Sequence, residues 1–334
     1  MKKKINEFHN YNKLNYVELS INRKNDDYSS ISEVINKNNI KIYHSPNNGF
    51  SLPQNKECTY ISTIHELYAL SNEEKVDEKY CKKFYYSIPK AIINSDKIIV
   101  VSDFIKSELK SYFNIKEDKV KTIYPGCSKI FKPISKEVVK NYLHKKYNLD
   151  DEYILFCGSI HPRKQLEKFI YIFSKIQKKI PKLKFVIIGK INGKRSNYYN
   201  KLKENIKKLD IQESVIFMNM IEQKYMTYFY CGAKCVVDFS EYEGFPMNCV
   251  EALKCNTPVI CTNSSSFKEI LDKKAMYVDI ERQNLIEDLI IELITNEKYR
   301  EKKIQLIKCF DEENKYTWKH SIDEHVKVYE EFLS

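Results

Sequence analysis

Two glutamates, Glu243 and Glu251, stand eight residues apart around the start of an expected helix. They follow an apolar run that ends at Asp238, and Pro246 suits the first helical turn because its missing N–H is not needed there. We therefore expect Glu243 in a strand-to-helix loop and Glu251 on the helix about a turn further on. Free N–H groups at such a helix start suit a phosphate or a polyol, and a carboxylate can accept two hydrogen bonds from a vicinal diol.

A basic pair, Arg163 and Lys164, opens another expected helix in the sequence Gly158-Ser-Ile-His-Pro-Arg-Lys. The glycine permits close approach to the backbone, and the two cations can neutralise a diphosphate, arginine by its forked donors and lysine as a point charge. Taken in isolation, such residues are more often a solvated basic turn.

Weaker signals lie at two other places. His65 and Glu66 follow an apolar run, but a single histidine at a strand end is more often structural. Ser266 and Glu269 are three residues apart and predict a capping box at a helix start.

Short β-branched runs alternate with amphipathic stretches, which is typical of βαβ units and parallel sheets. The expected strands of the first half are 41–44, 60–64, 97–101 and 120–124, and those of the second half are 153–157, 184–188, 214–218, 233–238, 258–261 and 275–279. The expected helices include 135–147, 166–180, 198–209, 247–254 and a segment within 312–334. The sequence therefore predicts two α/β domains facing a cleft, with ligands at the carboxyl ends of the strands.

The series of strands is interrupted near Pro125-Gly126 and Lys132-Pro133, where we place a domain boundary. The predicted units are a first domain over 1–132, a second domain over 133–312, and a helix over 313–334 that packs across both. The first forty residues contain no glycine and no clear apolar strand, with 16–21 as the best substitute. We therefore expect an abbreviated N-terminal domain.

The composition excludes several classes of protein. No apolar run reaches the ~20 residues of a membrane span, and no apolar stretch follows the basic start, so we expect a cytoplasmic protein without a secretory signal. The ten cysteines form no Cys-x-x-Cys pair, which disfavours a zinc cluster or a disulfide framework. The net charge of +11 is concentrated in residues 1–150, but its lysines are dispersed, which argues against nucleic acid. A basic first half suits an anionic membrane face or simply a lysine-rich solvated surface.

The string Glu243-Gly-Phe-Pro, with Glu251-Ala and Asn256-Thr-Pro-Val-Ile after it, resembles the Glu-x7-Glu signature of retaining glycosyltransferases of the two-domain GT-B fold, family 4. The basic pair and the His65-Glu66 strand end are also similar to segments of that family. The resemblance implies two Rossmann-like domains, an acceptor-side domain over 1–132 and a nucleotide-sugar-binding domain over 133–312. It also implies a nucleoside-diphosphate sugar as donor. It covers about residues 42–331 and is strongest over 153–270.

The resemblance also implies roles for particular residues. Arg163 and Lys164 hold the diphosphate, Glu251 the donor ribose, and Glu243 and His65 the donor sugar, with Glu66 orienting its loop. Further substrate contacts are implied at Gly158, Ser159, Gly244, Phe245, Pro246 and Met247, where Pro246 removes one possible backbone donor. Ser265 and Ser266 are weaker candidates.

The sequence has no Asp-x-Asp, so we expect a metal-independent transferase that needs no cofactor beyond its donor. The spellings of the motifs are similar to those of enzymes that add mannose, rhamnose or related sugars to bacterial surface polysaccharides. The expected partners are the donor, a lipid-linked or glycan acceptor, the inner membrane face and a partner transferase. Two alternatives stay open: a non-catalytic subunit that binds nucleotide sugar or supports another transferase, and an epimerase of the same architecture.

Overall fold

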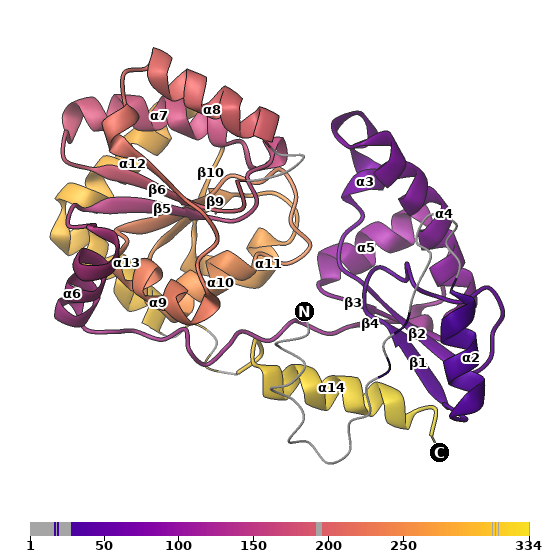
Figure 1. Ribbon diagram of the computed structural model, residues 1–334. Coiled ribbons are helices and arrows are strands. Elements are labelled where there is room, and N and C mark those ends of the chain that lie inside the picture. The colour runs from indigo at the N-terminus through magenta and orange to yellow at the C-terminus, as the bar shows by residue number, and fades with distance from the viewer. Residues whose placement is uncertain are drawn as a thin grey trace.

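Two parallel β-sheets, each covered by helices, form the two halves of the protein (Figure 1). The computed structural model describes Val17, Leu19 and residues 28–191, 196–308, 310, 312 and 314–333. The best substitute for a first strand, 16–21, lies largely outside the described residues. Within them, the architecture confirms the predicted pair of parallel-sheet α/β domains.

The first sheet has four parallel strands in the order β1-β2-β3-β4. They are β1 (Ile42–Ser45), β2 (Thr59–Ile64), β3 (Lys97–Val100) and β4 (Val120–Thr122). The helices of this half are α2 (Ser29–Lys37), α3 (Tyr68–Ser71), α4 (Glu78–Asn94) and α5 (Asp103–Tyr112). Phe84 and Ile88 of α4 and Ile105 of α5 pack with the buried strand residues Ile98 and Val100. This core fixes the carboxyl ends of β2 and β3 relative to α5.

The second sheet has six parallel strands in the order β10-β9-β8-β5-β6-β7. They are β5 (Tyr153–Cys157), β6 (Lys184–Ile188), β7 (Val215–Met218), β8 (Cys235–Asp238), β9 (Val259–Thr262) and β10 (Met276–Val278). The strand order reverses beside β5, so the loops after β5 and β8 diverge there and leave room for a ligand.

Helices cover both faces of this sheet (Figure 1). One face carries α7 (Leu166–Lys179), α8 (Ser196–Lys208) and α12 (Gln283–Thr295). The other carries α6 (Lys136–Tyr147), α9 (Gln223–Gly232), α10 (Met247–Lys254), α11 (Phe267–Leu271) and α13 (Glu297–Lys308). The buried strand residues point alternately into these two cores, as a sheet covered on both sides requires.

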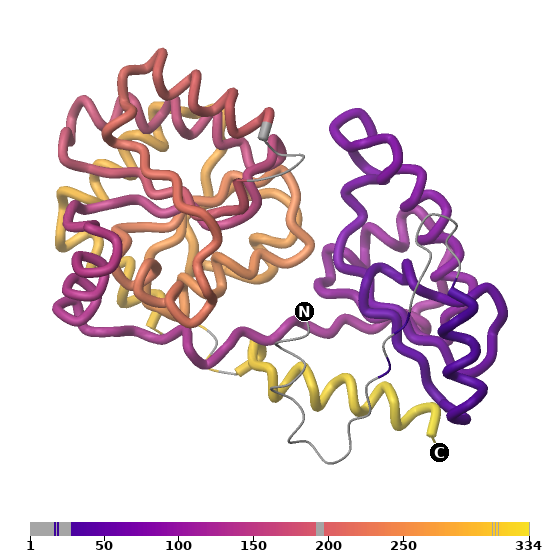
Figure 2. The backbone as a smooth tube through the Cα atoms, viewed as in Figure 1, coloured from indigo at the N-terminus to yellow at the C-terminus, as the bar shows by residue number. Residues whose placement is uncertain are grey.

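The chain crosses from the first half to the second through residues 123–135 and returns at its end (Figure 2). The last helix, α14 (Trp318–Glu330), lies against the first sheet, where Val328 packs with Ile61, Ile99 and Ile123. Its start is held by the backbone of the crossing segment, because the N–H of Cys127 donates to the carbonyl of Tyr316 at 2.8 Å. The C-terminal helix therefore ties the end of the chain back to the first half.

Candidate functional site

The predicted site residues lie where parallel strands end. His65 and Glu66 follow β2, Gly158 follows β5, and Asp238 is the last residue of β8. Carboxyl ends of parallel strands share one edge of a sheet, and here the edges of the two sheets meet. Contacts between the halves occur at this place, so the site is built from both.

Arg163 and Lys164 lie in a short 3-10 helix, Pro162–Lys164, between β5 and α7. One Nη of Arg163 lies 3.2 Å from Glu66 Oε2 of the first half, and the other lies 3.9 Å from Glu243 Oε1. Lys164 Nζ lies 2.6 Å from Glu243 Oε1 and 3.2 Å from Asp238 Oδ2. The structure thus brings the basic pair together with Glu66 and Glu243.

Burial makes this group electrostatically strong. The Lys164 side chain is 4% exposed and that of Asp238 is 3% exposed. Burial alone lowers the pKa of Lys164, but Asp238 and Glu243 together raise it above its usual value. Lys164 is therefore a fixed cation at neutral pH, in surroundings where charge interactions are weakly screened.

Two serines hold the backbone of Glu243. The N–H of Glu243 donates to Ser265 Oγ at 2.9 Å, and Ser266 Oγ donates to the carbonyl of Glu243 at 2.8 Å. The predicted capping box is wrong, because Ser266 makes no cap hydrogen bond to α11 and Glu269 instead accepts from the N–H groups of Asp103 and Phe104. These side chains have partners far away in sequence, which a local motif does not reveal.

The backbone of Gly244 packs tightly against the first half. A Cβ on this residue would lie 1.9 Å from the carbonyl oxygen of His65, so any larger residue would push the halves apart. Ser102, which caps α5 as its position before a helix predicts, also donates to the carbonyl of Gly244 at 2.7 Å. The loop is therefore anchored to the first half by its backbone.

A cavity of about 360 Å³ opens beside this contact. Its walls come from both halves, and they include six of the predicted residues: His65, Glu66, Glu243, Gly244, Phe245 and Met247. The imidazole of His65 is fixed by a 2.7 Å contact between Nε2 and the carbonyl of Pro46, and its backbone N–H donates to Asn48 Oδ1 at 2.6 Å. Both anchors hold His65 at the wall of the cavity.

The loop after β5 packs against the start of α10. A Cβ on Gly158 would lie 3.3 Å from Asn248 Nδ2 and 3.7 Å from Lys164 Cε, while Asn248 donates to the carbonyl of Cys157 at 2.5 Å. Ser159 follows in the same loop. Pro246 is the N-cap residue of α10, one position before the predicted first turn.

Glu251 lies further along α10, separate from the Arg163–Lys164 group. Its side chain is buried, and Tyr230 of α9 donates to its Oε2 at 2.7 Å. Burial raises the pKa of Glu251 to about 7. A carboxyl group with this pKa is partly protonated at neutral pH, so small changes in its surroundings change its charge.

Two contributors were missed by the sequence reasoning. Asp238, noted only as a strand end, is a buried partner of Lys164. Tyr242 belongs to the loop after β8, yet its ring packs in the core of the first half, with centroids 5.4 Å from those of Tyr68 and Phe104. A tyrosine between two glutamates carries no pattern that predicts this placement.

Among the described residues, no three His, Cys, Asp or Glu side chains gather so that they could hold a metal ion. None of their helices is long and apolar enough to cross a membrane.

Comparisons with known proteins show the family of the chain. The family model for glycosyl transferases group 1 matches residues 140–308, and the model for glycosyltransferase family 4 matches residues 11–128. O-antigen chain mannosyltransferase B of Escherichia coli is 23% identical over 288 residues, which cover 86% of this chain and 74% of that protein.

Two solved structures share the fold. Sucrose-phosphate synthase of Thermosynechococcus elongatus aligns with a TM-score of 0.74 at 18% identity, over 91% of this chain and 76% of that one. Anabaena HepE, in a complex with UDP and glucose, aligns with a TM-score of 0.73 at 12% identity, over 91% of this chain and 81% of that one. The fold is thus the predicted GT-B fold. The match to the glycosyltransferase family 4 model begins at residue 11, upstream of residue 42, where the predicted resemblance begins. Because a single family model covers half of the chain, the protein belongs to the glycosyl transferases group 1 and is a glycosyltransferase.

Proposed function

We propose that this glycosyltransferase moves a hexose from a nucleoside-diphosphate sugar to a hydroxyl acceptor, retaining the anomeric configuration and using no metal ion. One observation carries the proposal: the fixed cations Arg163 and Lys164 contact Glu66 and Glu243, two carboxylates that line a cavity walled by both halves. Such a cavity can hold the donor and the acceptor on opposite sides.

The basic pair acts on the diphosphate. Negative charge builds on the leaving phosphate as its bond to the sugar carbon breaks, and buried cations stabilise that charge strongly. Three carboxylates, Glu66, Asp238 and Glu243, lie around the two cations. The diphosphate therefore takes the place of Glu66 on Arg163, and Glu66 keeps its second partner, the hydroxyl of Tyr80 at 3.1 Å.

The remaining residues bind the sugar and the nucleoside. His65, Glu243 and the backbone amides of Gly244 and Phe245 hold the sugar hydroxyls, and Glu251 accepts hydrogen bonds from the ribose. Gly158, Ser159, Pro246 and Met247 complete the contact surface. No side chain forms a covalent bond, because the leaving phosphate itself accepts the proton of the attacking hydroxyl.

The substrates are proposed from the relatives and from charge. The name of the Escherichia coli relative supports a mannose-like sugar and an O-antigen or similar surface polysaccharide. A lipid-linked or glycan acceptor at the inner membrane face fits the basic first half, where α4 exposes Tyr85, Tyr86 and Ile93. In this proposal the chain is cytoplasmic, lies at that membrane face and works with a partner transferase.

The test measures sugar transfer from a set of nucleoside-diphosphate sugars, with a soluble glycan or a lipid-linked acceptor in anionic vesicles as acceptor. Lys164→Ala should lower turnover by ~10²–10³-fold, because it removes the cation that stabilises the leaving group. Lys201→Ala, on the exposed surface of α8, is the matched control and should leave turnover unchanged.

Lys164→Ala also leaves Asp238 and Glu243 without their cation, so its fold must be checked by circular dichroism and thermal unfolding. Near-normal turnover of a folded Lys164→Ala chain contradicts the assigned role. Donor binding without transfer to either acceptor favours the non-catalytic subunit. If no nucleoside diphosphate raises the melting temperature of the wild-type chain, the donor class itself is wrong.

A further inference from the structure

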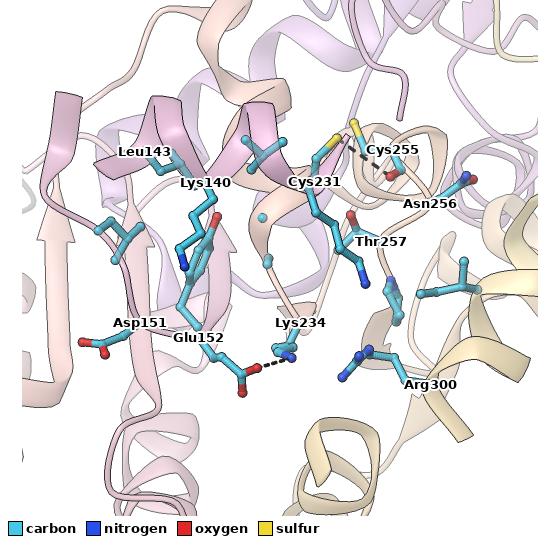
Figure 3. A pocket seen from close by; sticks show the side chains of 18 of the residues that line it. Lys140, Leu143, Asp151, Glu152, Cys231, Lys234, Cys255, Asn256, Thr257 and Arg300 are labelled. Atoms are coloured by element: carbon cyan, nitrogen blue, oxygen red, sulfur yellow. Dashed lines mark hydrogen bonds and ion pairs between the residues drawn. The ribbon is translucent and has the colours of Figure 1, made fainter. Parts of the chain in front are cut away.

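A second cavity, of about 480 Å³, lies at the far edge of the six-stranded sheet (Figure 3). It is bordered by residues that begin or precede the strands, including Tyr153, Lys234 and Pro258, and by α6 and α13. Amino ends of parallel strands lie at the edge opposite their carboxyl ends, so this cavity is distinct from the candidate active site. Two cysteines, Cys231 and Cys255, line it.

The two thiols lie beside each other. Cys231 is at the end of α9 and Cys255 is the C-cap residue of α10, and Figure 3 shows their sulfur atoms adjacent at the wall of the cavity. Cys231 Sγ lies 3.4 Å from the carbonyl oxygen of Lys132, and Cys255 Sγ lies 3.6 Å from Thr227 Oγ1. The two helix ends are also tied by Thr257, whose hydroxyl donates to the carbonyl of Tyr230 at 2.7 Å.

The pair differs in acidity and in access. A hydrogen bond from the Cys255 thiol lowers the pKa of Cys231 below its usual value, although partial burial opposes this. The same contact raises the pKa of Cys255 above its usual value. Cys231 is partly exposed at the cavity, whereas Cys255 is buried. The accessible thiol is therefore the more acidic of the two and the one that more readily forms the nucleophilic thiolate.

We propose that Cys231 is a site of oxidative modification and that Cys255 is its resolving thiol. The oxidant is a peroxide. The Cys231 thiolate attacks one peroxide oxygen, the O–O bond breaks, and hydroxide leaves to form water, which makes a sulfenic acid at Cys231. Cys255 then attacks that sulfur, its proton goes to the departing hydroxide as the S–O bond breaks, and a disulfide and a second water form. The two sulfurs lose two electrons in total, and the peroxide gains them.

The bond would close a loop that contains functional elements. Residues 232–254 include β8, the loop with Glu243 and the whole of α10. The disulfide would hold the end of α9 to the end of α10, next to the hydrogen bond between Tyr230 and Glu251. The modification would thus act on α9 and α10, which help to position the loop that carries Glu243, from the edge of the sheet opposite that loop.

The experiment uses the full wild-type chain. Brief alkylation with iodoacetamide at neutral pH, followed by peptide mapping, should modify Cys231 at least about tenfold faster than Cys58, which is also partly exposed but whose pKa is raised by burial. Treatment with an equimolar amount of hydrogen peroxide should yield a peptide pair joined through Cys231 and Cys255, which a reductant separates.

Variants identify the order of events. In Cys255→Ser the sulfenic acid should persist on Cys231 and react with dimedone, whereas Cys231→Ser should form no joined peptides. The wild-type measurement needs no variant, so a folding defect in either variant leaves the test intact. Equal rates of labelling of Cys231 and Cys58 would overturn the proposal. It would also be overturned if peroxide neither joined Cys231 to Cys255 nor modified Cys231 in another way.

Discussion

Glu251 combines deep burial with neutral hydrogen-bond partners, Tyr230 and Gln223, on the neighbouring helix α9. The hydroxyl of Tyr230 donates a hydrogen bond to Glu251, and the charge of Glu251 raises the pKa of the nearby Cys157 thiol. Because burial raises the pKa of Glu251 to about 7, the folded chain keeps a proton that the unfolded chain loses at lower pH. Its contribution to stability must therefore change with pH.

We expect the free energy of unfolding contributed by Glu251 to fall as the pH rises from about 4.5 to about 7. In that range the folded state binds more protons than the unfolded state, so raising the pH favours unfolding, by roughly 3 kcal/mol in total. Glu251→Gln should remove this dependence and become the more stable chain above pH ~7. Chemical denaturation of both chains at several pH values measures it.

Glu222→Gln is the matched control, because Glu222 is an exposed carboxylate at the start of α9. It should leave the pH dependence as in the wild type. Parallel curves for wild type and Glu251→Gln across the window would show that the buried carboxyl does not titrate there.

At the scale of elements, the sequence predicts most of the fold. All ten predicted strands are present, with ends that differ by at most two residues, and α10 has the predicted bounds, 247–254. β-Branched runs indicate the strands, and the end of α10 is marked by Asn256, which takes a left-handed φ of 58°, and by Pro258, which cannot continue a helix. Both signals are local.

The same reasoning missed contacts that depend on distant segments. Arg163 and Lys164 were predicted as a pair, but the carboxylate of Asp238 beside Lys164 depends on how β8 lies next to β5. The capping box failed for the same reason, because Glu269 of α11 caps α5 in the other half of the molecule. Spacing in a sequence cannot show which helix a side chain will reach.

We expect Glu269→Ala to lower the free energy of unfolding by about 1–2 kcal/mol. The carboxylate accepts from the N–H of Asp103 at 2.8 Å and from that of Phe104 at 2.9 Å, and its loss leaves the start of α5 without this cap. Glu137→Ala is the control, because it removes an exposed first-turn acid from α6. Equal stability of the two variants, measured by denaturant unfolding, would contradict a cap that acts between the halves.

At the scale of the whole molecule, Tyr242 joins the two halves. Its hydroxyl accepts from the N–H of Leu67 at 2.8 Å and donates to the carboxylate of Glu108, whose pKa is raised by burial. Glu241, the neighbouring residue of the same loop, forms an ion pair with Lys75 of the first half at 2.8 Å. The loop that carries Glu243 is thus anchored to the first half by the side chain of Tyr242, the preceding residue.

We expect Tyr242→Ala to cost about 3–5 kcal/mol and to let the halves separate, because it empties a buried socket. Tyr242→Phe keeps the ring and should cost only about 1–2 kcal/mol, from the unpaired groups at Leu67 and Glu108. Thermal unfolding measures the stability, and small-angle X-ray scattering should show a larger radius of gyration for Tyr242→Ala.

Tyr228→Ala serves as the control, since Tyr228 stacks on Tyr142 within the second half, with centroids 3.9 Å apart. It should lower stability without changing the radius of gyration. An unchanged radius for Tyr242→Ala would mean that the remaining contacts suffice to keep the halves together.

The placement of Tyr242 bears on how genes for such enzymes can be recombined. A hybrid that joins the first half of a relative to the second half of this chain would present this ring to a foreign surface. Unless residues equivalent to Leu67, Tyr68, Phe104 and Glu108 came with it, the hybrid would lack a matching seat. Swapping whole halves between relatives is therefore constrained by this aromatic side chain, and hybrids that carry both the ring and the residues around it have the best prospect of folding.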